Sequence, residues 1–491
     1  MSLRALGFAI WLGFILFCIG LNQSHGLSCA DDAWFAIVAK SLASGLGYAT
    51  TFPVSGELAH PIPFNPLTGT GPTLIVPCAL AFRLFGKSEV LPGLIAILTW
   101  GSLLTFLLAR INRRIDAFSF LFGVGVMCAA FVATFAFHSE QWYAFLGEIV
   151  ATALVILAHW ILSSERFNGG WLVLAGLALG LAFQAKFLAV IAATGIILLF
   201  VIRGIDAGCP LGQWLRYFAT LLIACLIPTL AFEGYKLFQL GADGYAMNWR
   251  ELLATTKEMG TQSAVHVTWS SLQERMALVY ERFGLNLLAL FALNAAGVFL
   301  SVRSASKNWT LFAAGILLSM TSAAIYWATL SKGWPRYLVI CIAMGAFLLS
   351  IPMFAHAWRG KLFFALFAIL LLKTGFSRSG NIFDSIDRGL FRPTEERAAR
   401  SSLVRIIERR QKEGPIILAS RWWGSLVDVE FLLPGSVNFE RIETVLELPG
   451  PKLILLNHGF DPPLDEVINT ARARTSSVVF AGGPYELIEV R

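Results

Sequence analysis

Long apolar stretches recur along most of this chain, and they constrain its fold more than any other feature. A stretch of about 20 apolar residues can cross the ~30 Å hydrocarbon layer of a membrane as a helix. Inside that layer the backbone must satisfy its own hydrogen bonds, so each stretch is expected to be α-helical. Spans are expected near residues 5–21, 88–109, 117–137, 144–163, 170–186, 188–203, 217–232, 285–302, 309–330, 337–356 and 361–374. The sequence therefore predicts a polytopic α-helical membrane protein with about eleven transmembrane helices.

The balance of residue types agrees with this class. Of the 491 residues, 56% are hydrophobic and only 14% are charged, as is typical of membrane proteins. The formal net charge is +7, but the basic residues are scattered singly over short loops rather than gathered on one face. They are better explained by orientation in the membrane than by a nucleic-acid surface, and no nucleic-acid partner is expected.

The positions of the basic residues predict the orientation. With the N-terminus in the cytoplasm, the cytoplasmic loops contain Arg110, Arg113, Arg114, Arg166, Arg203, Arg216, Arg303, Lys307, Arg359 and Lys361. The opposite short loops contain few basic residues, as the positive-inside rule requires. The first apolar stretch is longer than the core of a typical signal peptide, so it is expected to remain as an uncleaved span. We therefore predict that the loops 22–87 and 233–284 lie outside the cytoplasm, which for the expected inner-membrane location is the periplasm.

One apolar stretch, "TLIVPCALAFRLFG" at 73–86, is too short to span the membrane and contains Pro77 and Arg83. An interfacial or half-inserted helix here preserves the charge rule. A full span would instead place the cluster Arg110 to Arg114 outside. The sequence therefore predicts a short helix that enters the membrane surface without crossing it.

The chain changes character at about residue 376, where apolar runs shorten and charges become more frequent. A charged helix is expected at 394–412 and a second helix at 462–474. Strands are expected at 415–420 and 452–457 and in "SVVFAG" and "YELIEV". Strands that alternate with helices indicate a small α/β domain. We therefore divide the chain into a membrane domain, 1–375, and a soluble periplasmic domain, 376–491.

Two adjacent carboxylates follow the first span in "SCADDAWFAIVAKSLASGLGY". Ser28 and Asp31 have the spacing of a capping box, in which a carboxylate only binds the backbone at a helix start. Asp31 also shares a helix face with the apolar residues Phe35 and Leu42. A carboxylate is unfavourable on an apolar face, so its presence there indicates a functional role. Asp32 projects about 100° away around the helix, so the two carboxylates cannot have one role. Asp31 is the first candidate for chemistry and Asp32 the second.

This acidic pair, followed by "AKSLASGLGY" and "TGTGPTLIVPCALAFRLFG", resembles the large first extracytoplasmic loop of GT-C glycosyltransferases. The likeness is strongest to the family 39 and lipid A-modifying group: protein O-mannosyltransferases, aminoarabinose transferases and rhizobial core-sugar transferases. Further similar stretches, in order, are "FLGEIVATALVILA", "GLALGLAFQAKFLAVI", "FEGYKLFQLG", "SKGWPRYLV" and "RWWGSLVDVEFLLP". The resemblance covers most of the chain and implies a GT-C-like bundle.

The resemblance implies transfer of a sugar from a polyprenyl-phosphate carrier to a hydroxyl group at the outer membrane face. The acceptor class stays open between lipid A or lipopolysaccharide core, another glycan and a protein. Such attack on an anomeric carbon needs a base and passes through a transition state of oxocarbenium character. Asp31 or Asp32 is expected to be that base. The departing lipid phosphate needs cationic donors, and Arg336 with Tyr337 begins a span at the same surface.

Further polar residues lie at this predicted face. Lys186 either contributes to the phosphate site or extends to the lipid headgroups. Glu148 lies just inside the fourth span, where a charge is costly, and is expected to orient the acceptor or the base. His138 and Glu140 border the same cavity, although ordinary solvated loop residues would look alike. Some relatives carry a lysine directly before the proline of the short helix; here "TGTGPT" has none, which gives more weight to Arg336, Lys186 or Arg83.

No metal and no cofactor are expected, because hard cations require more oxygen ligands than Asp31 and Asp32 supply. The rival class is a polytopic transporter or flippase of a lipid-linked glycan. Such proteins usually place ionisable residues near the membrane midplane on broken helices, often in two repeated halves. Here the acidic residues gather at one membrane face, beside a long loop and a soluble domain, so the sequence favours an enzyme.

Overall fold

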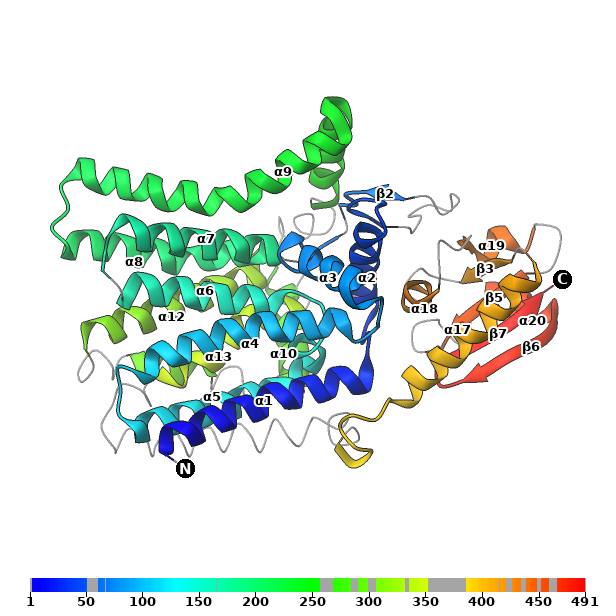
Figure 1. Cartoon of the computed structure of the whole chain (residues 1–491), viewed down its shortest axis with the longest axis horizontal. Coiled ribbons are helices and arrows are strands. Elements are labelled where there is room, and N and C mark those ends of the chain that lie inside the picture. Colours follow the sequence, from blue (N-terminus) through cyan, green and yellow to red (C-terminus); the bar gives the residue numbers. More distant parts are fainter. Residues whose placement is uncertain are drawn as a thin grey trace.

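The computed structural model describes most of the chain. The described residues are 2–50, 61–66, 68–164, 166–256, 268–283, 290–298, 306–331, 335–351, 386–414, 416–420, 426–433, 439–447, 452–458 and 466–490. Within them, the structure has a bundle of membrane-length helices and a smaller strand-containing domain, with helix α2 (Ala30–Ala43) lying across the end of the bundle between the two (Figure 1).

Six helices of the described part are long and apolar enough to cross a membrane. They are α1 (Leu3–His25), α4 (Leu91–Asn112), α5 (Ala117–His138), α8 (Ala193–Asp206) with the short helix η2 (Phe187–Ala192) before it, α9 (Leu211–Thr256) and α12 (Lys307–Thr329). Shorter apolar helices are α6 (Glu148–Ser164), α7 (Gly169–Ala185) and α13 (Val339–Leu348), which follows the turn η5 (Pro335–Leu338). Each overlaps a predicted span; α9 continues beyond its predicted span 217–232 into the predicted loop 233–284, with a non-helical break at Gly241. In the predicted span 285–302, residues 290–298 are described and helical; the span 361–374 lies outside the described residues.

The short helix α3 (Pro72–Phe85) has 14 residues and contains Pro77, as the sequence predicted for 73–86. Its length is too small for a membrane span. The apolar side chains of Val76, Leu80 and Leu84 are at least half exposed on it, and they recur every four residues, so they share one face. This face is suited to contact with lipid, while the helix packs against α2, α4 and α7.

Close backbone approach holds the membrane helices together. The most extensive helix pair among the described residues is α7 and α9. A Cβ atom on Gly180 would lie 2.2 Å from the backbone oxygen of Cys225, and one on Gly176 would lie 2.5 Å from that of Leu221. Small residues at a helix interface allow the two backbones to approach this closely. The resulting van der Waals contacts favour helix association in a membrane, where no hydrophobic effect acts between helices. The apolar composition therefore predicts the helices, and the glycines determine which helices touch.

The C-terminal domain contains a five-stranded sheet in the order β4-β3-β5-β7-β6. Its strands are β3 (Ile417–Ser420), β4 (Phe439–Arg441), β5 (Lys452–Asn457), β6 (Thr475–Gly482) and β7 (Tyr485–Val490); its helices are α17 (Glu395–Glu413), α18 (Val427–Leu432), α19 (Ile442–Val445) and α20 (Glu466–Ala473). Strand β3 is parallel to β4 and β5, whereas β7 is antiparallel to both β5 and β6. The small C-terminal α/β unit and its predicted elements are thus confirmed, and β4, α18 and α19 are additions.

A buried arginine joins the two parts. Arg400 on α17 is 1% exposed and donates to the backbone oxygens of His25, the last residue of α1, and of Leu27, which lies between α1 and α2. It also pairs with Asp428 at 2.9 Å and with Glu89 at 3.2 Å. A buried guanidinium is tolerated only when its charge is paired in this way. The C-terminal domain therefore fixes the segment that leads into the acidic pair.

Candidate functional site

Asp32 anchors the start of α2. Its Oδ2 atom accepts hydrogen bonds from the backbone nitrogen of Ser28 at 3.0 Å and from the Ser28 hydroxyl at 3.3 Å. Its Oδ1 atom accepts from the backbone nitrogen of Phe145 at 3.1 Å. The side chain is buried, and burial raises the pKa of Asp32 to about 6 although these hydrogen bonds favour the charged form. A carboxylate therefore does bind the backbone at the start of this helix, as in a capping box. The residue that does so is Asp32 rather than Asp31.

Asp31 has a different environment. Its side chain is 36% exposed and forms an ion pair with Arg336 of η5, which is 305 positions away in the sequence. The guanidinium of Arg336 also lies over the ring of Tyr337, 5.7 Å from its centre. A carboxylate that is partly open to solvent and held by one arginine is available for proton transfer, whereas Asp32 is enclosed by its three donors.

Glu148 and Lys186 form a second ion pair, between the first turn of α6 and the end of α7. The Lys186 amine lies 2.9 Å from Oε1 of Glu148, whose side chain is 3% exposed. The other carboxylate oxygen of Glu148 is buried and has no hydrogen-bond partner among the described residues. Lys186 also lies 5.4 Å from the ring centre of Phe35 on α2. This lysine therefore turns inward to a buried carboxylate and an aromatic ring, rather than outward to lipid headgroups.

Two glycines allow the loops of this region to meet. Gly147, directly before Glu148, has φ +86°, and a Cβ atom there would lie 2.6 Å from the backbone oxygen of Ala185. A Cβ atom on Gly71 would lie 2.0 Å from the backbone oxygen of Gln184. Only glycine fits at both positions without displacing backbone. The end of α7 is thereby brought against both the first loop and the start of α6.

The first loop contributes "TGTG" to the same place. Thr70 forms an isolated antiparallel bridge with Lys186, and its hydroxyl donates to the backbone oxygen of Leu146 at 2.9 Å. A Cβ atom on Gly69 would lie 3.6 Å from the Lys186 amine. The sequence has no lysine or arginine directly before the proline of α3. In the structure, Lys186 at the end of α7 places its amine beside that loop instead.

The two ion pairs belong to one cluster. Phe35, which touches Lys186, lies one helical turn after Asp31 on the same face of α2. Arg336 lies within electrostatic range of both Asp31 and Glu148. Two carboxylates and two cations thus meet at one end of the bundle. Cations that can each donate several hydrogen bonds suit an anion such as a phosphate, and a carboxylate beside them can accept a proton.

The other predicted residues have separate places. Arg83 donates to the backbone oxygens of Ala43 and Leu42, at 2.9 and 3.4 Å, so it caps the end of α2 opposite to Asp31 and is not brought to the cluster. Glu140 lies in the turn η1 (Ser139–Trp142) and within electrostatic range of Cys29, at the start of α2. His138 is the last residue of α5, and its side chain lies outside the described residues.

Sequence reasoning missed Thr70, Gly147 and Phe35 as parts of this site. The available signal was a glycine beside a polar residue inside an otherwise apolar stretch, as in "TGTG" and "LGE". No group of three or more His, Cys, Asp and Glu side chains is placed to hold a metal among the residues that the structure describes.

Breaking the pair of Glu148 and Lys186 should be costly. Removing one partner of a buried ion pair leaves the other charge unpaired and costs about 3–5 kcal/mol. We expect Glu148→Gln and Lys186→Met each to lower the unfolding temperature of the detergent-purified protein, and the double variant to recover part of that loss. Lys307→Gln is the matched control, because its partner Asp206 and its own side chain are exposed and such a pair is worth at most about 1 kcal/mol. Single variants as stable as the wild type would contradict the buried pair.

Comparison with solved structures identifies the fold. The crystal structure of ArnT from Cupriavidus metallidurans bound to undecaprenyl phosphate aligns with a TM-score of 0.65 and 12% identity, over 99% of this chain and 97% of that chain. The apo state of the same protein aligns with a TM-score of 0.61 and 13% identity over the same shares. No protein-family model and no curated protein sequence matches this chain. Over nearly its whole length, this chain therefore has the GT-C fold of ArnT.

Proposed function

We propose that this protein is a membrane glycosyltransferase that moves a sugar from a polyprenyl-phosphate donor to a hydroxyl of an envelope acceptor at the periplasmic face. The observation that carries the proposal is the ion pair of Asp31 and Arg336, next to that of Glu148 and Lys186, at one end of a GT-C bundle. The ArnT structure with this fold contains undecaprenyl phosphate, which supports a lipid-linked donor here. The acceptor class stays open between lipid A or lipopolysaccharide core, another glycan and a protein.

The donor phosphate would bind to the cations of the cluster. Arg336 can hold a phosphate through two parallel hydrogen bonds, and Lys186 can add a point charge. The ring of Tyr337 stacks against the Arg336 guanidinium, which lies 5.7 Å from the ring centre, and would help to hold it in place. If the donor phosphate binds Arg336, it would replace Asp31 in the ion pair with that arginine. Donor binding would thereby release the base at the moment when the acceptor needs it.

The transfer step follows from this arrangement. The acceptor oxygen attacks the anomeric carbon and its proton passes to Asp31, while the bond from that carbon to the phosphate oxygen breaks. The phosphate leaves with the electron pair, and its growing charge is stabilised by Arg336 and Lys186. Oxocarbenium character in the transition state is favoured by nearby carboxylates.

The remaining carboxylates would act as supports. Glu148 holds Lys186 beside the "TGTG" loop and is expected to orient the acceptor or the base. Asp32 fixes α2 to the segment before α6 through Phe145, and it is the second candidate for the base. Glu140 and His138 would border the cavity.

A transfer assay with purified components tests the proposal. Protein in detergent, with a polyprenyl-phosphate sugar and candidate acceptors, should form a glycosylated product. A flippase would give no glycosylated product, because it moves the lipid-linked glycan without forming a glycosidic bond. Mass spectrometry of envelope glycolipids and glycoproteins from a deletion strain would identify the acceptor, since one glycan should lose a single sugar.

The proposed orientation makes a separate prediction about topology. A reporter that is active only after export should be active when fused after Arg491, and a reporter that is active only in the cytoplasm should be active when fused after Arg114. Fusions of the opposite reporter type at the same two positions are the controls. The reversed pattern would place the cluster of Asp31 and Arg336 in the cytoplasm and would rule out a periplasmic reaction.

A further inference from the structure

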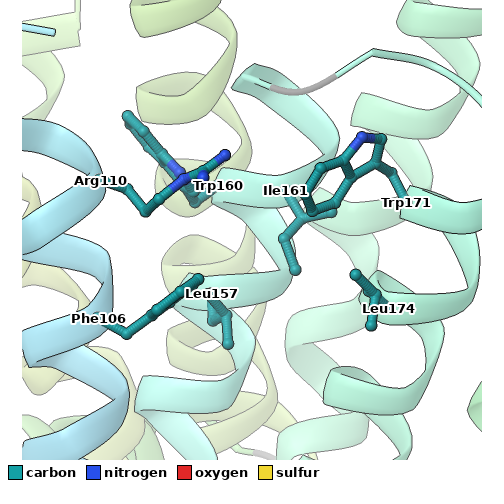
Figure 2. Close-up of a pocket in the computed structure, with 7 residues that line it drawn as sticks. All are labelled: Phe106, Arg110, Leu157, Trp160, Ile161, Trp171 and Leu174. Carbon is teal, nitrogen blue, oxygen red and sulfur yellow. The ribbon is translucent and has the colours of Figure 1, made fainter. Parts of the chain in front are cut away.

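A pocket lies between α4, α6 and α7, at some distance along the bundle from the cluster described above (Figure 2). Its volume is about 180 Å³, and its walls are almost entirely apolar. Phe106 of α4, Leu157 and Ile161 of α6 and Leu174 of α7 line it. Phe106 and Leu174 are about half exposed, so the pocket opens to the side of the bundle, where lipid chains would surround it.

One end of the pocket is basic and aromatic. Figure 2 shows Arg110 next to Trp160 at the same end as Trp171, with Phe106 and Leu174 toward the other end. The guanidinium of Arg110 lies 6.0 Å from the ring centre of Trp171. That of Arg114 lies 5.0 Å from the ring centre of Trp160. The two guanidinium groups therefore lie on the aromatic rings at one end of an otherwise apolar pocket.

Further charges increase this polarity. Arg113 and Arg166 are exposed in the two loops that flank the same helix ends. The nearby acid Asp116 accepts hydrogen bonds from the backbone nitrogen and the hydroxyl of Ser119, at 2.8 and 2.5 Å, and so caps the start of α5. This end has an excess of positive charge, because the acids Asp116 and Glu165 are outnumbered there by Arg110 in the last turn of α4 and by Arg113, Arg114 and Arg166 in the adjoining segments.

The pocket and the Asp31 cluster lie at opposite ends of the same helices. Arg110 is in the last turn of α4, Trp160 is near the end of α6 and Trp171 is at the start of α7. The cluster instead uses Glu148 at the start of α6 and Lys186 at the end of α7. The pocket is thus separate from the proposed donor site and belongs to the membrane face that the positive-inside rule assigns to the cytoplasm.

We infer that this pocket binds an anionic phospholipid of the cytoplasmic leaflet, with an acyl chain against the apolar wall and the headgroup phosphate on Arg110. Charge complementarity carries the argument. Basic pockets between membrane helices on the cytoplasmic side attract anionic headgroups, and Trp side chains favour the level of the headgroups. A zwitterionic headgroup would bring a positively charged amine next to these arginines, and the repulsion would weaken its binding. The inference does not depend on the proposed glycosyl transfer.

Native mass spectrometry of the detergent-purified protein tests this inference. We expect phosphatidylglycerol to bind more tightly than phosphatidylethanolamine with the same acyl chains. Arg110→Gln should lower the affinity for phosphatidylglycerol about fivefold, the effect of about 1 kcal/mol for one charge near the surface, while Arg110→Lys should keep most of it. Leu174→Trp retains every arginine but fills the mouth of the pocket, and it should lower the affinity for both lipids.

Arg203→Gln is the matched control, because Arg203 lies in the last turn of α8, on the same predicted face but outside the pocket. It should bind phosphatidylglycerol as the wild type does. If Arg203→Gln lost as much affinity for phosphatidylglycerol as Arg110→Gln, binding would depend only on the overall positive charge of this face. That result would overturn the inference. So would wild-type binding by Arg110→Gln or by Leu174→Trp. A preference of the pocket for a polyprenyl phosphate over phosphatidylglycerol, lost in Arg110→Gln, would overturn it as well, because the occupant would then be an isoprenoid.

Discussion

Replacing Asp31 by Asn should lower the rate of sugar transfer by about 10² or more, the usual scale for a lost general base. The amide has nearly the shape of the carboxylate but cannot take the acceptor proton. Because the ion pair of Asp31 and Arg336 is 36% exposed on both sides, its loss should cost little stability. Turnover is to be measured with a purified polyprenyl-phosphate sugar, alongside the unfolding temperature and the amount of protein in the membrane.

Asp32→Asn is the matched control for this experiment. Its side chain is buried and accepts three hydrogen bonds, and the amide nitrogen of Asn cannot accept the bonds from Ser28. An unsatisfied buried donor costs about 1–3 kcal/mol, so this variant should be distinctly less stable than Asp31→Asn. Near-normal transfer by Asp31→Asn would move the role of base to Asp32 or Glu148.

Replacing Arg336 by Ala should lower the rate by roughly 10² to 10³, as for the removal of one donor that stabilises developing charge. Arg336→Lys should keep part of the activity, since lysine retains the charge but not the two parallel hydrogen bonds. Rates are to be measured at saturating acceptor. Arg203→Ala, a cation in the last turn of α8, is the control and should transfer at the wild-type rate.

An alternative for Arg336 is that it only anchors a helix at the headgroups. Equal rates for the wild type and Arg336→Ala would favour that role and remove the residue from the site. The observed pairing adds a sharper test. Because Asp31 and Arg336 contact each other, their effects should be non-additive, and the double variant should be only slightly slower than the slower single variant. Losses that multiply would show that the two residues act independently.

The sequence by itself determined the secondary structure of most described regions. Lipid forces the backbone of an apolar stretch into a helix, so the predicted spans, such as 5–21 and 88–109, coincide with α1 and α4. The short helix α3 was predictable for the same reason, since 14 residues cannot cross the membrane. In the C-terminal domain, the strand "YELIEV" coincides with β7. These features depend on the local pattern of apolar residues, which the sequence displays directly.

The sequence separated the roles of the two adjacent acids only in part. The sequence placed Asp31 on an apolar helix face and made it the first candidate, and the structure shows it paired with a cation. The spacing of Ser28 and Asp31 made capping the alternative role for Asp31, but the helix begins after Cys29 and Asp32 forms the contacts with Ser28. The position of a helix end is the least reliable part of a sequence-based assignment, and a shift of one residue exchanges the two carboxylates.

Only the tertiary structure decided which charges meet. Asp31 and Arg336 are 305 positions apart, and the sequence could name both without showing that they touch. Lys186 had two equal interpretations until its contact with Glu148 was seen, and Arg83, a candidate for the cavity, instead caps the far end of α2. Hydropathy fixes the depth of a residue in the membrane but not its neighbours around the bundle. Those neighbours depend on close backbone contacts at residues such as Gly71 and Gly147, which bring distant segments together only once the helices have packed.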